Sequence, residues 1–330
     1  MAQAIMLRAY GGPDELRPET VEVGEPEAGE LKVRQTAIGV NYHDVYVRSG
    51  LYDTLVPPGI PGIEAVGVVT AVGPGVDGFA PGDRVGYITN QYGAYASERV
   101  LPARIALHLP ESMDDRLAAT VLLKGLTAEM LLRQVHRVEP GMTVLVHAAA
   151  GGVGRLLCQW ASALGATVIG TAGTTEKRDI ALRAGCDHVI LYREVDFVAE
   201  VRRLTNGRGV DVVYDGVGGD TFYGSLESLA TFGHLVNFGQ ASGPVEPLAM
   251  PLLAANSLSV TRPIIFHYTR DTDRLRTMAA SLFDAFADGT LTAEPGEAFP
   301  LDDAARAHEV LEARTATGPL LLIPDEGSAV

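Results

Sequence analysis

Cysteine is scarce in this chain. Its 330 residues include only Cys158 and Cys186, which are too few for a disulfide framework or for a zinc lobe built from four thiolates. The first eight residues, MAQAIMLR, have no basic segment followed by an apolar stretch of about 7 to 15 residues, so we expect no secretory signal. Together these features predict a protein of a reducing compartment, which we take to be the cytoplasm.

The chain also lacks a long hydrophobic run and an excess of basic residues. No segment approaches the about 18 consecutive apolar residues of a membrane-spanning helix. Lys and Arg number 26 against 41 Asp and Glu, which makes the net charge −15. A field of this sign repels phosphate backbones and anionic lipids, so we expect neither nucleic acid nor a membrane as a partner. A local basic pocket for one small phosphate remains compatible with this charge.

What is present is an ordinary globular composition, with 47% hydrophobic and 20% charged residues. The length exceeds the about 150 residues of a typical domain, so two domains with a cleft between them are the first expectation. From residue 1 to about residue 110, short β-branched runs alternate with Gly and Pro. The turns around 73–75 and 81–83 favour a compact barrel or sandwich. The expected strands are 32–38, 65–72, 84–88 and 94–100.

After Ser112 the pattern changes to alternating helices and strands, which predicts a doubly wound parallel sheet and an α/β fold class. A helix over 118–132 precedes it. The expected strands are 143–148, 167–169, 189–190, 210–213, 234–238 and 258–261. The expected helices between them end at 164 or span 176–184 and 198–204. Beyond Pro263, helices over 273–287 and 303–314 lead to the apolar strand 320–323, which we expect to return to the first domain.

A glycine-rich loop joins the first of these strands to its helix. It reads AAAGGVG over residues 148–154, and small residues there let the backbone approach a pyrophosphate at the helix N-terminus. Gly151, Gly152 and Val153 are the expected contacts. Ala149 replaces the first glycine of the ideal motif, but the order strand, loop, helix favours a dinucleotide-binding Rossmann domain. The alternative is a glycine turn that serves only helix packing.

The type of dinucleotide is indicated by what is missing after the next strand. An enzyme that uses NAD places Asp or Glu there for the ribose hydroxyls, whereas this chain reads GTAGTTEK over residues 170–177. The hydroxyls of Thr174 and Thr175 and the cation of Lys177 suit a ribose phosphate. We therefore predict NADPH as the cofactor, against the alternative that Lys177 is an ordinary solvated lysine.

At this point the sequence resembles a known family. Gly141-Met142, Leu145, 149–152, Gly154, Gln159 and Ser162 have the spacing of the quinone oxidoreductase and zeta-crystallin signature, within the medium-chain dehydrogenase/reductase superfamily. The resemblance is closest to the bacterial NADPH:quinone reductases and covers nearly the whole chain. It includes the segments 41–52, 124–127, 213–215, 237–239 and 311–314.

The resemblance implies a GroES-like β-barrel domain (1–126 and 265–330), a Rossmann domain (127–264), a cofactor between them and a homodimer joined through the Rossmann sheets. It also implies the positions of the site residues. Asn41, Tyr46 and Thr127 would lie near the nicotinamide, and Gly152 and Val153 at the pyrophosphate. The remaining implied cofactor residues are Gly173, Lys177, Tyr192, Phe238, Gly239, Gln240 and Arg314. Val217 departs from the serine common in related reductases, which removes one side-chain hydrogen bond to the cofactor.

Zinc separates the branches of this superfamily. The alcohol dehydrogenase branch has a Cys and a Gly-His-Glu motif where this chain reads Asn41-Tyr42-His43-Asp44 and Gly62-Ile63-Glu64. Catalytic zinc needs about three protein ligands, so we predict no metal. Glu64 is then expected to be a structural carboxylate and His43 a loop residue.

Without a metal, the chemistry depends on positioning and on weak donors. Tyr46, Arg48 and Tyr52, with Asn41 and Thr127, are the candidate catalytic residues, and the tyrosine hydroxyls can bond a quinone oxygen. The alternative is that the tyrosines only pack or stack on the cofactor. The predicted function is hydride transfer from NADPH to a quinone. Reduction of activated alkenes (enones, haloacrylates, enoyl thioesters) and a cofactor-binding protein of the crystallin or RNA-binding type remain alternatives.

Overall fold

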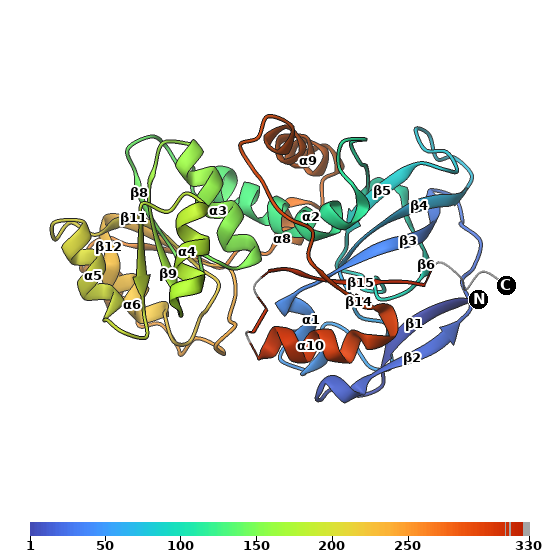
Figure 1. The fold of residues 1–330 in the computed structure, drawn as a ribbon, viewed down its shortest axis with the longest axis horizontal. Helices are drawn as coiled ribbons and strands as arrows, with labels where there is room; N and C mark the ends of the chain where they lie inside the picture. Colours follow the sequence, from blue (N-terminus) through green and yellow to red (C-terminus); the bar gives the residue numbers. More distant parts are fainter. Residues whose placement is uncertain (314, 317, 326–330) are drawn as a thin grey trace. The chain divides into compact units, whose positions relative to one another are not determined.

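The computed structural model describes residues 1–313, 315–316 and 318–325, which form two compact units (Figure 1). The first unit contains residues 1–123 and 271–279 and the described residues from 293 onward. The second contains residues 124–270 and 280–292. The sequence placed the domain borders after residues 126 and 264 and assigned everything beyond 264 to the first domain. In the structure, the segments 124–126, 265–270 and 280–292 belong to the second unit instead.

The first unit is built on a seven-stranded sheet with the order β14-β15-β3-β4-β5-β7, in which β6 pairs with β3. A separate antiparallel pair, β1 and β2, lies beside it in this unit. The buried side chains of this unit include Ile5 of β1 and Leu31, Val33 and Ile38 of β3, so both sheets contribute to its core. The strands are β1 (Ala2–Leu7), β2 (Leu16–Val21), β3 (Glu30–Val40), β4 (Glu64–Val72), β5 (Arg84–Ile88), β6 (Glu98–Pro102), β7 (Ala106–His108), β14 (Glu297–Pro300) and β15 (Leu320–Ile323).

One strand of this unit begins later than the sequence predicted. The run 94–100 was expected to be a strand, but β6 covers Glu98–Pro102. The residues before it bond to two different strands, because Ile5 N donates to Tyr95 O and Gln35 N donates to Ser97 O. A segment that crosses from one partner to another forms no continuous ladder, and bends occur at Tyr95 and Ser97.

The expected return of the chain to its first domain is confirmed. β15 pairs antiparallel with β3, with Leu320 opposite Val40 and Leu322 opposite Ile38. The three leucines of β15 are buried. β15 lies between β14 and β3 in the sheet. A short, fully apolar run is typical of such a buried strand.

The second unit contains a six-stranded parallel sheet with the order β10-β9-β8-β11-β12-β13. This is the strand order of dinucleotide-binding doubly wound sheets, and it confirms the predicted fold. Its order reverses between β8 and β11, where such sheets bind ligands at the carboxyl ends of the strands. The strands are β8 (Thr143–Val146), β9 (Thr167–Ala172), β10 (His188–Leu191), β11 (Val210–Asp215), β12 (Leu229–Asn237) and β13 (Ser259–Thr261).

The helices follow the predicted alternation, with boundaries that shift by a few residues. The predicted helix 118–132 is α2 (Asp115–Glu129), which continues into the π-helical turn η3 (Met130–Val135). Four short helices were not predicted: α1 (Tyr42–Arg48), α6 (Phe222–Ser228), α7 (Pro251–Ala254) and α8 (Ile265–Tyr268). The other helices are α3 (Gly152–Ala163), α4 (Thr175–Arg183), α5 (Phe197–Leu204), α9 (Thr272–Ala287) and α10 (Ala304–Glu312), with 3-10 turns η1 (Pro13–Glu15), η2 (Ala103–Ile105) and η4 (Leu301–Asp303).

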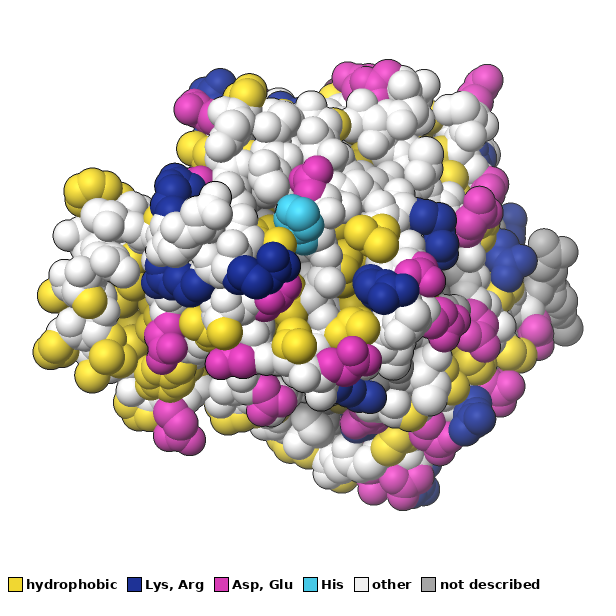
Figure 2. Space-filling view, turned by 60° about the vertical axis from the view of Figure 1, so that its left-hand side comes forward, with side chains coloured by type: hydrophobic (Ala, Val, Ile, Leu, Met, Phe, Trp, Pro, Cys, Tyr) yellow, Lys and Arg dark blue, Asp and Glu magenta, His cyan; other side chains and the backbone are white. Residues whose placement is uncertain are grey.

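The surface carries charges of both signs. Figure 2 shows acidic and basic side chains interspersed on the face that it presents. Among the described residues, no helix combines the length and apolar character needed to cross a bilayer.

Candidate active site

The glycine-rich loop turns sharply between β8 and α3. Ala148 has φ +51°, in the left-handed region, and its carbonyl accepts a hydrogen bond from Gly151 N at 2.8 Å. Ala149, which replaces the first glycine of the ideal motif, is fully buried, and Ala148 makes the turn. A Cβ on Gly154 would lie 2.3 Å from the Ala148 carbonyl oxygen, so only glycine lets the helix start this close to the strand.

This geometry makes the first turn of α3 an anion site. Gly151 is the residue before the helix, and the first N–H groups of a helix have no partner within it. Gly152 and Val153 contribute these groups, and the helix dipole adds positive potential. A pyrophosphate is the ligand that such a loop fits.

The end of β9 is open and basic. A Cβ on Gly173 would lie 2.8 Å from the Tyr192 hydroxyl and 3.4 Å from Arg193 Nε, so Gly173 and Tyr192 are neighbours. The Thr174 hydroxyl accepts from Lys177 N at 3.3 Å and caps α4. Thr174 can therefore offer a ligand its hydroxyl hydrogen while its oxygen serves the helix. Arg193 is a second cation that the sequence analysis missed, although it directly follows Tyr192.

Asp215, at the end of β11, organises the next loop. Its Oδ1 accepts hydrogen bonds from Val217 N at 2.8 Å and from Gly218 N at 3.0 Å. The Val217 carbonyl accepts from Ser242 Oγ at 2.9 Å. The backbone groups of Val217 are thus engaged within the loop, which explains how the position tolerates valine. The sequence analysis included Asp215 only in the matching segment 213–215 and gave it no role, because its partners follow it in a loop that has no motif of its own.

The loop after β12 packs on the loop after β11. Phe238 N donates to Asp215 O at 2.8 Å, and a Cβ on Gly239 would lie 2.6 Å from the Gly216 carbonyl oxygen. Gln240 lies in the same loop, against Gly218. The loops that follow β8, β9, β11 and β12 all leave the carboxyl ends of parallel strands, so they occupy one edge of the sheet. Thr127 lies on α2, where it is the partly exposed residue in the otherwise buried stretch 121–130.

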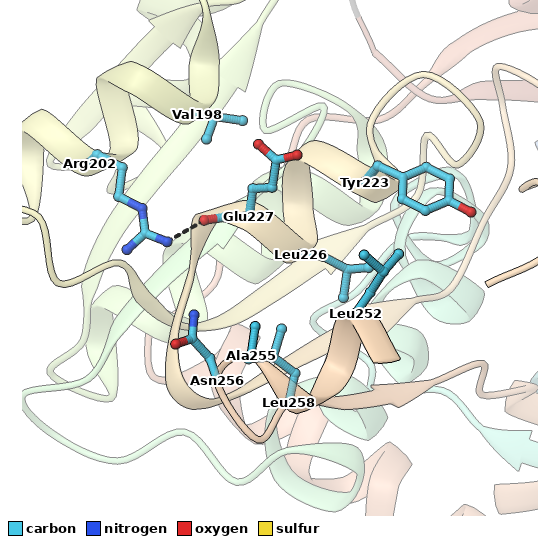
Figure 3. Close-up of a pocket in the computed structure, with 9 residues that line it drawn as sticks. All are labelled: Val198, Arg202, Tyr223, Leu226, Glu227, Leu252, Ala255, Asn256 and Leu258. Atoms are coloured by element: carbon cyan, nitrogen blue, oxygen red, sulfur yellow. Dashed lines mark hydrogen bonds between the residues drawn. The ribbon is translucent and has the colours of Figure 1, made fainter. Parts of the chain in front are cut away.

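A surface hollow of about 410 Å³ is a separate feature of this unit (Figure 3). It is lined by residues of α5 and α6 and by the segment 252–258, which precedes β13. It therefore lies toward the opposite edge of the sheet from the glycine-rich loop. The side chains that line it are Val198, Arg202, Tyr223, Leu226, Glu227, Leu252, Ala255, Asn256 and Leu258.

In the first unit, Asn41 is held by two carboxylates. Its backbone N donates to Asp44 Oδ2 at 2.8 Å, which begins α1, and its Nδ2 donates to Glu64 Oε1 at 2.8 Å. Glu64 is fully buried and its Oε2 accepts from Leu123 N at 2.9 Å. These are the contacts of the structural carboxylate that the sequence predicted. Among the described residues, no group of three His, Cys, Asp or Glu is arranged to hold a metal ion.

An aromatic cluster surrounds α1. The rings of Tyr46 and Tyr52 meet edge to face with centroids 5.1 Å apart, and His43 meets Tyr52 at 5.5 Å. The structure therefore brings together the two tyrosines that the sequence proposed. His43 was expected in a loop, but it lies in helix α1, because the hydrogen bond between Asn41 N and Asp44 starts the helix before it.

Arg48 is directed into the protein. It is 2% exposed, and its guanidinium donates to both oxygens of Glu312, at 2.7 and 2.9 Å, and to Gly11 O at 3.1 Å. These contacts are those of a structural anchor for α1 and α10. They do not support the expectation that Arg48 acts on substrate beside Tyr46 and Tyr52.

A buried polar chain continues from this ion pair. Tyr95 Oη donates to Asp44 Oδ2 at 3.1 Å and lies 3.0 Å from His308 Nε2. Burial raises the pKa of Tyr95 well above its usual value, and Asp44 adds to this effect. Burial, with a contribution from Arg48, lowers the pKa of His308 to about 3. Both side chains are therefore neutral at physiological pH. Tyr95 contacts Asp44 and His308 contacts Arg48, and both of these residues lie on α1. Arg314, predicted to close over the cofactor, lies outside the described residues.

Two family models match the chain. Residues 27–111 match the model described as the alcohol dehydrogenase GroES-like domain, and residues 152–283 match the model described as zinc-binding dehydrogenase. The two matches fall on the two kinds of sheet described above. They define a dehydrogenase-type protein with a GroES-like unit and a dinucleotide-binding unit.

Curated proteins and solved structures that are similar over the whole chain narrow this class. A 2-haloacrylate reductase of Burkholderia sp is 43% identical over 98% of this chain and 99% of its own. Quinone oxidoreductase 1 of Escherichia coli K12 is 43% identical over 98% of this chain and 100% of its own. The solved structure of an Escherichia coli quinone oxidoreductase complexed with NADPH superposes with a TM-score of 0.95, at 42% identity over 98% of this chain and 100% of that one. The chain belongs to the quinone oxidoreductase family of the medium-chain dehydrogenases/reductases.

Proposed function

We propose that this chain is an oxidoreductase that binds NADPH and reduces a quinone without the help of a metal ion. The observation that carries the proposal is the basic, carboxylate-free end of β9 beside a glycine-rich anion loop. The names of the relatives support it, since several are quinone oxidoreductases and one was solved with NADPH.

The cofactor would be held by the loops at the carboxyl edge of the parallel sheet. The amides of Gly152 and Val153 suit its pyrophosphate, and Lys177, Tyr192 and Arg193 suit its ribose phosphate. When bound, NADPH supplies a hydride. Asn41, Tyr46 and Thr127 are proposed near the nicotinamide, and the bond from Asn41 to Glu64 fixes the orientation of that amide group.

The acceptor would be bound by the aromatic cluster of α1. Tyr46 and Tyr52 present two rings against which a planar quinone can stack, and their hydroxyls can donate to a developing oxyanion. Holding acceptor and donor about 3 to 3.5 Å apart supplies much of the rate by positioning alone. Both oxygens of Glu64 are engaged with Asn41 and Leu123, so no metal is needed for this arrangement.

Reduction of activated alkenes is the second candidate. The 2-haloacrylate reductase is as similar to this chain as the quinone oxidoreductases are. Both reactions begin with hydride transfer, but an alkene acceptor must also receive a proton on carbon.

A comparison of acceptors tests the proposal. We expect a small quinone to give a higher kcat/KM than a haloacrylate or an enone, with NADPH oxidation followed by absorbance. Tyr46→Phe and Tyr52→Phe should each lower the quinone value by less than about 10²-fold, because positioning dominates over any single donor. Dialysis against a strong chelator should leave the rate unchanged. Efficient turnover of the alkene with almost none of the quinone would reverse the assignment.

The preference for NADPH over NADH is tested at Lys177. A charge-assisted bond to phosphate contributes about 1.5 to 3 kcal/mol, so Lys177→Ala should weaken NADPH binding about tenfold or more and leave NADH unaffected. Arg178→Ala is the control, because Arg178 lies next to Lys177 on α4 and pairs with Asp179. Fluorescence titration with both nucleotides measures the effect. An equal loss for NADH and NADPH would show that Lys177 does not bind the phosphate.

We also propose a homodimer joined through β13, the edge strand of the parallel sheet. An edge strand presents unpaired backbone groups that favour pairing with a second sheet. Large apolar side chains near it are exposed, including Phe232 at 78% and Ile264 at 49%. Light scattering in solution would give about twice the chain mass of 34.9 kDa if this is correct.

A further inference from the structure

Tyr92 occupies an unusual place beside the proposed acceptor site. It lies in the loop between β5 and β6 and is 5% exposed, yet its φ of +56° is in the left-handed region that favours glycine. A bulky residue in that region costs about 1 to 3 kcal/mol and persists only where its surroundings hold it. Here Arg99 Nη1 donates to the Tyr92 carbonyl at 2.6 Å. Strain of this kind is common at functional positions.

The Tyr92 hydroxyl joins two other polar groups. It is hydrogen-bonded to Thr54 Oγ1 and lies 3.3 Å from His43 Nε2. The Tyr92 and His43 rings are stacked, with centroids 6.0 Å apart and an interplanar angle of 28°. His43 in turn packs edge to face on Tyr52. All of these residues belong to the first unit.

The three polar groups differ in exposure. Thr54 is exposed to solvent, Tyr92 is buried, and His43 is partly exposed and packs against Tyr52. A hydroxyl, a phenol and an imidazole can each accept one proton while giving up another. The contacts therefore link the exposed Thr54 hydroxyl, through the buried Tyr92 hydroxyl, to the imidazole that packs on Tyr52.

We propose that Thr54, Tyr92 and His43 carry a proton from water to the reduced acceptor. This inference rests on the proposed function, because it supplies the proton that must follow the nicotinamide hydride. Tyr92 and Thr54 act through His43 and are positioning residues, whereas His43 would touch the acceptor.

The acceptor takes a hydride on one atom and becomes an anion, and its oxygen then forms a bond to the proton on His43 Nδ1. As that N–H bond breaks, His43 Nε2 takes the phenol proton of Tyr92. Tyr92 is reprotonated by Thr54, and Thr54 by a solvent water molecule, whose hydroxide passes into the bulk solvent. The imidazole ends with its proton on Nε2 and returns to the other tautomer by exchange with solvent.

The protonation states fit this role. Burial lowers the pKa of His43 to about 4, so the ring is neutral and can accept on one nitrogen while donating from the other. Burial raises the pKa of Tyr92, a hydrogen bond from Thr54 opposes this, and the charges of Asp44, Tyr10 and Tyr52 add to the rise. Tyr92 therefore keeps its proton until His43 takes it.

Removal of one hydroxyl tests the path. Tyr92→Phe keeps the ring and its packing, and we expect kcat for quinone reduction to fall about tenfold or more, within the range of general acid catalysis, while KM is unchanged. The solvent deuterium isotope effect on kcat should increase, because arrival of the proton becomes slow. Thr54→Val should behave in the same way and Thr54→Ser should restore the rate. Tyr10→Phe is the control, since the Tyr10 hydroxyl bonds the nearby Leu55 carbonyl outside the path.

A spectroscopic measurement separates this role from packing. In the apo-protein, ¹⁵N NMR of labelled histidine should show His43 mainly as the Nδ1–H tautomer, and Tyr92→Phe should change that population. Unchanged kcat, isotope effect and tautomer in Tyr92→Phe would overturn the proposal. If neither a quinone nor an alkene supports NADPH oxidation by the wild-type protein, the proposed function is refuted instead.

Discussion

Replacement of Glu312 by alanine should lower the free energy of unfolding by about 3 kcal/mol, because it leaves the charge of Arg48 buried without a partner. The Arg48 side chain is 3% exposed and that of Glu312 is 36% exposed, so the loss should fall at the lower end for buried pairs. We expect the midpoint of thermal unfolding to fall by about 4 °C for a chain of 330 residues. Calorimetry and urea titration measure both quantities.

Glu309→Ala is the matched control for this experiment. Glu309 lies on the same helix, α10, and pairs with Arg306, but their side chains are 52% and 66% exposed. A surface pair of this kind contributes about 0 to 1 kcal/mol. If both substitutions lower the free energy of unfolding by the same amount, the ion pair with Glu312 does not hold Arg48 in the structure.

Gly154→Ala should weaken NADPH binding about 10²-fold. The new methyl group would collide with the Ala148 carbonyl oxygen, since an ideal Cβ lies 2.3 Å away. The start of α3 must then move from the loop and misplace the amides of Gly152 and Val153. The loss of two charge-assisted bonds of about 1.5 kcal/mol each corresponds to this factor. Nucleotide titration by fluorescence measures it.

Gly24→Ala controls for the general effect of adding a methyl group. No atom lies within 4 Å of a Cβ built on Gly24, and its φ is not positive. This variant should bind NADPH as the wild type does. Retention of full affinity by Gly154→Ala would mean that the amides at the start of α3 do not hold the cofactor.

Local pattern was enough for much of the fold. The alternation of strands and helices after residue 112 predicted the parallel sheet, because buried parallel strands are short apolar runs separated by helices. The glycine-rich loop was visible for the same reason, since its function depends on consecutive residues. The apolar run Leu320–Ile323 indicated a buried strand, and its pairing with β3 confirmed where it returns.

Other features depend on partners that are distant in the sequence. Arg48 resembles a catalytic cation beside two tyrosines, and only its contact with Glu312, far along the chain, shows that it is an anchor. The residues just before β6 resemble a strand, but they bond to β1 and β3 in turn. The link from Thr54 through Tyr92 to His43 joins three segments that no motif connects.

The sequence by itself therefore determined the doubly wound sheet, the anion loop and the carboxylate-free end of β9, because each is encoded by neighbouring residues. The tertiary structure decided which polar side chains near α1 are anchors and which lie on the path to the tyrosine cluster. Burial and hydrogen-bond partners make that distinction, and both arise only when segments far apart in the chain are packed together.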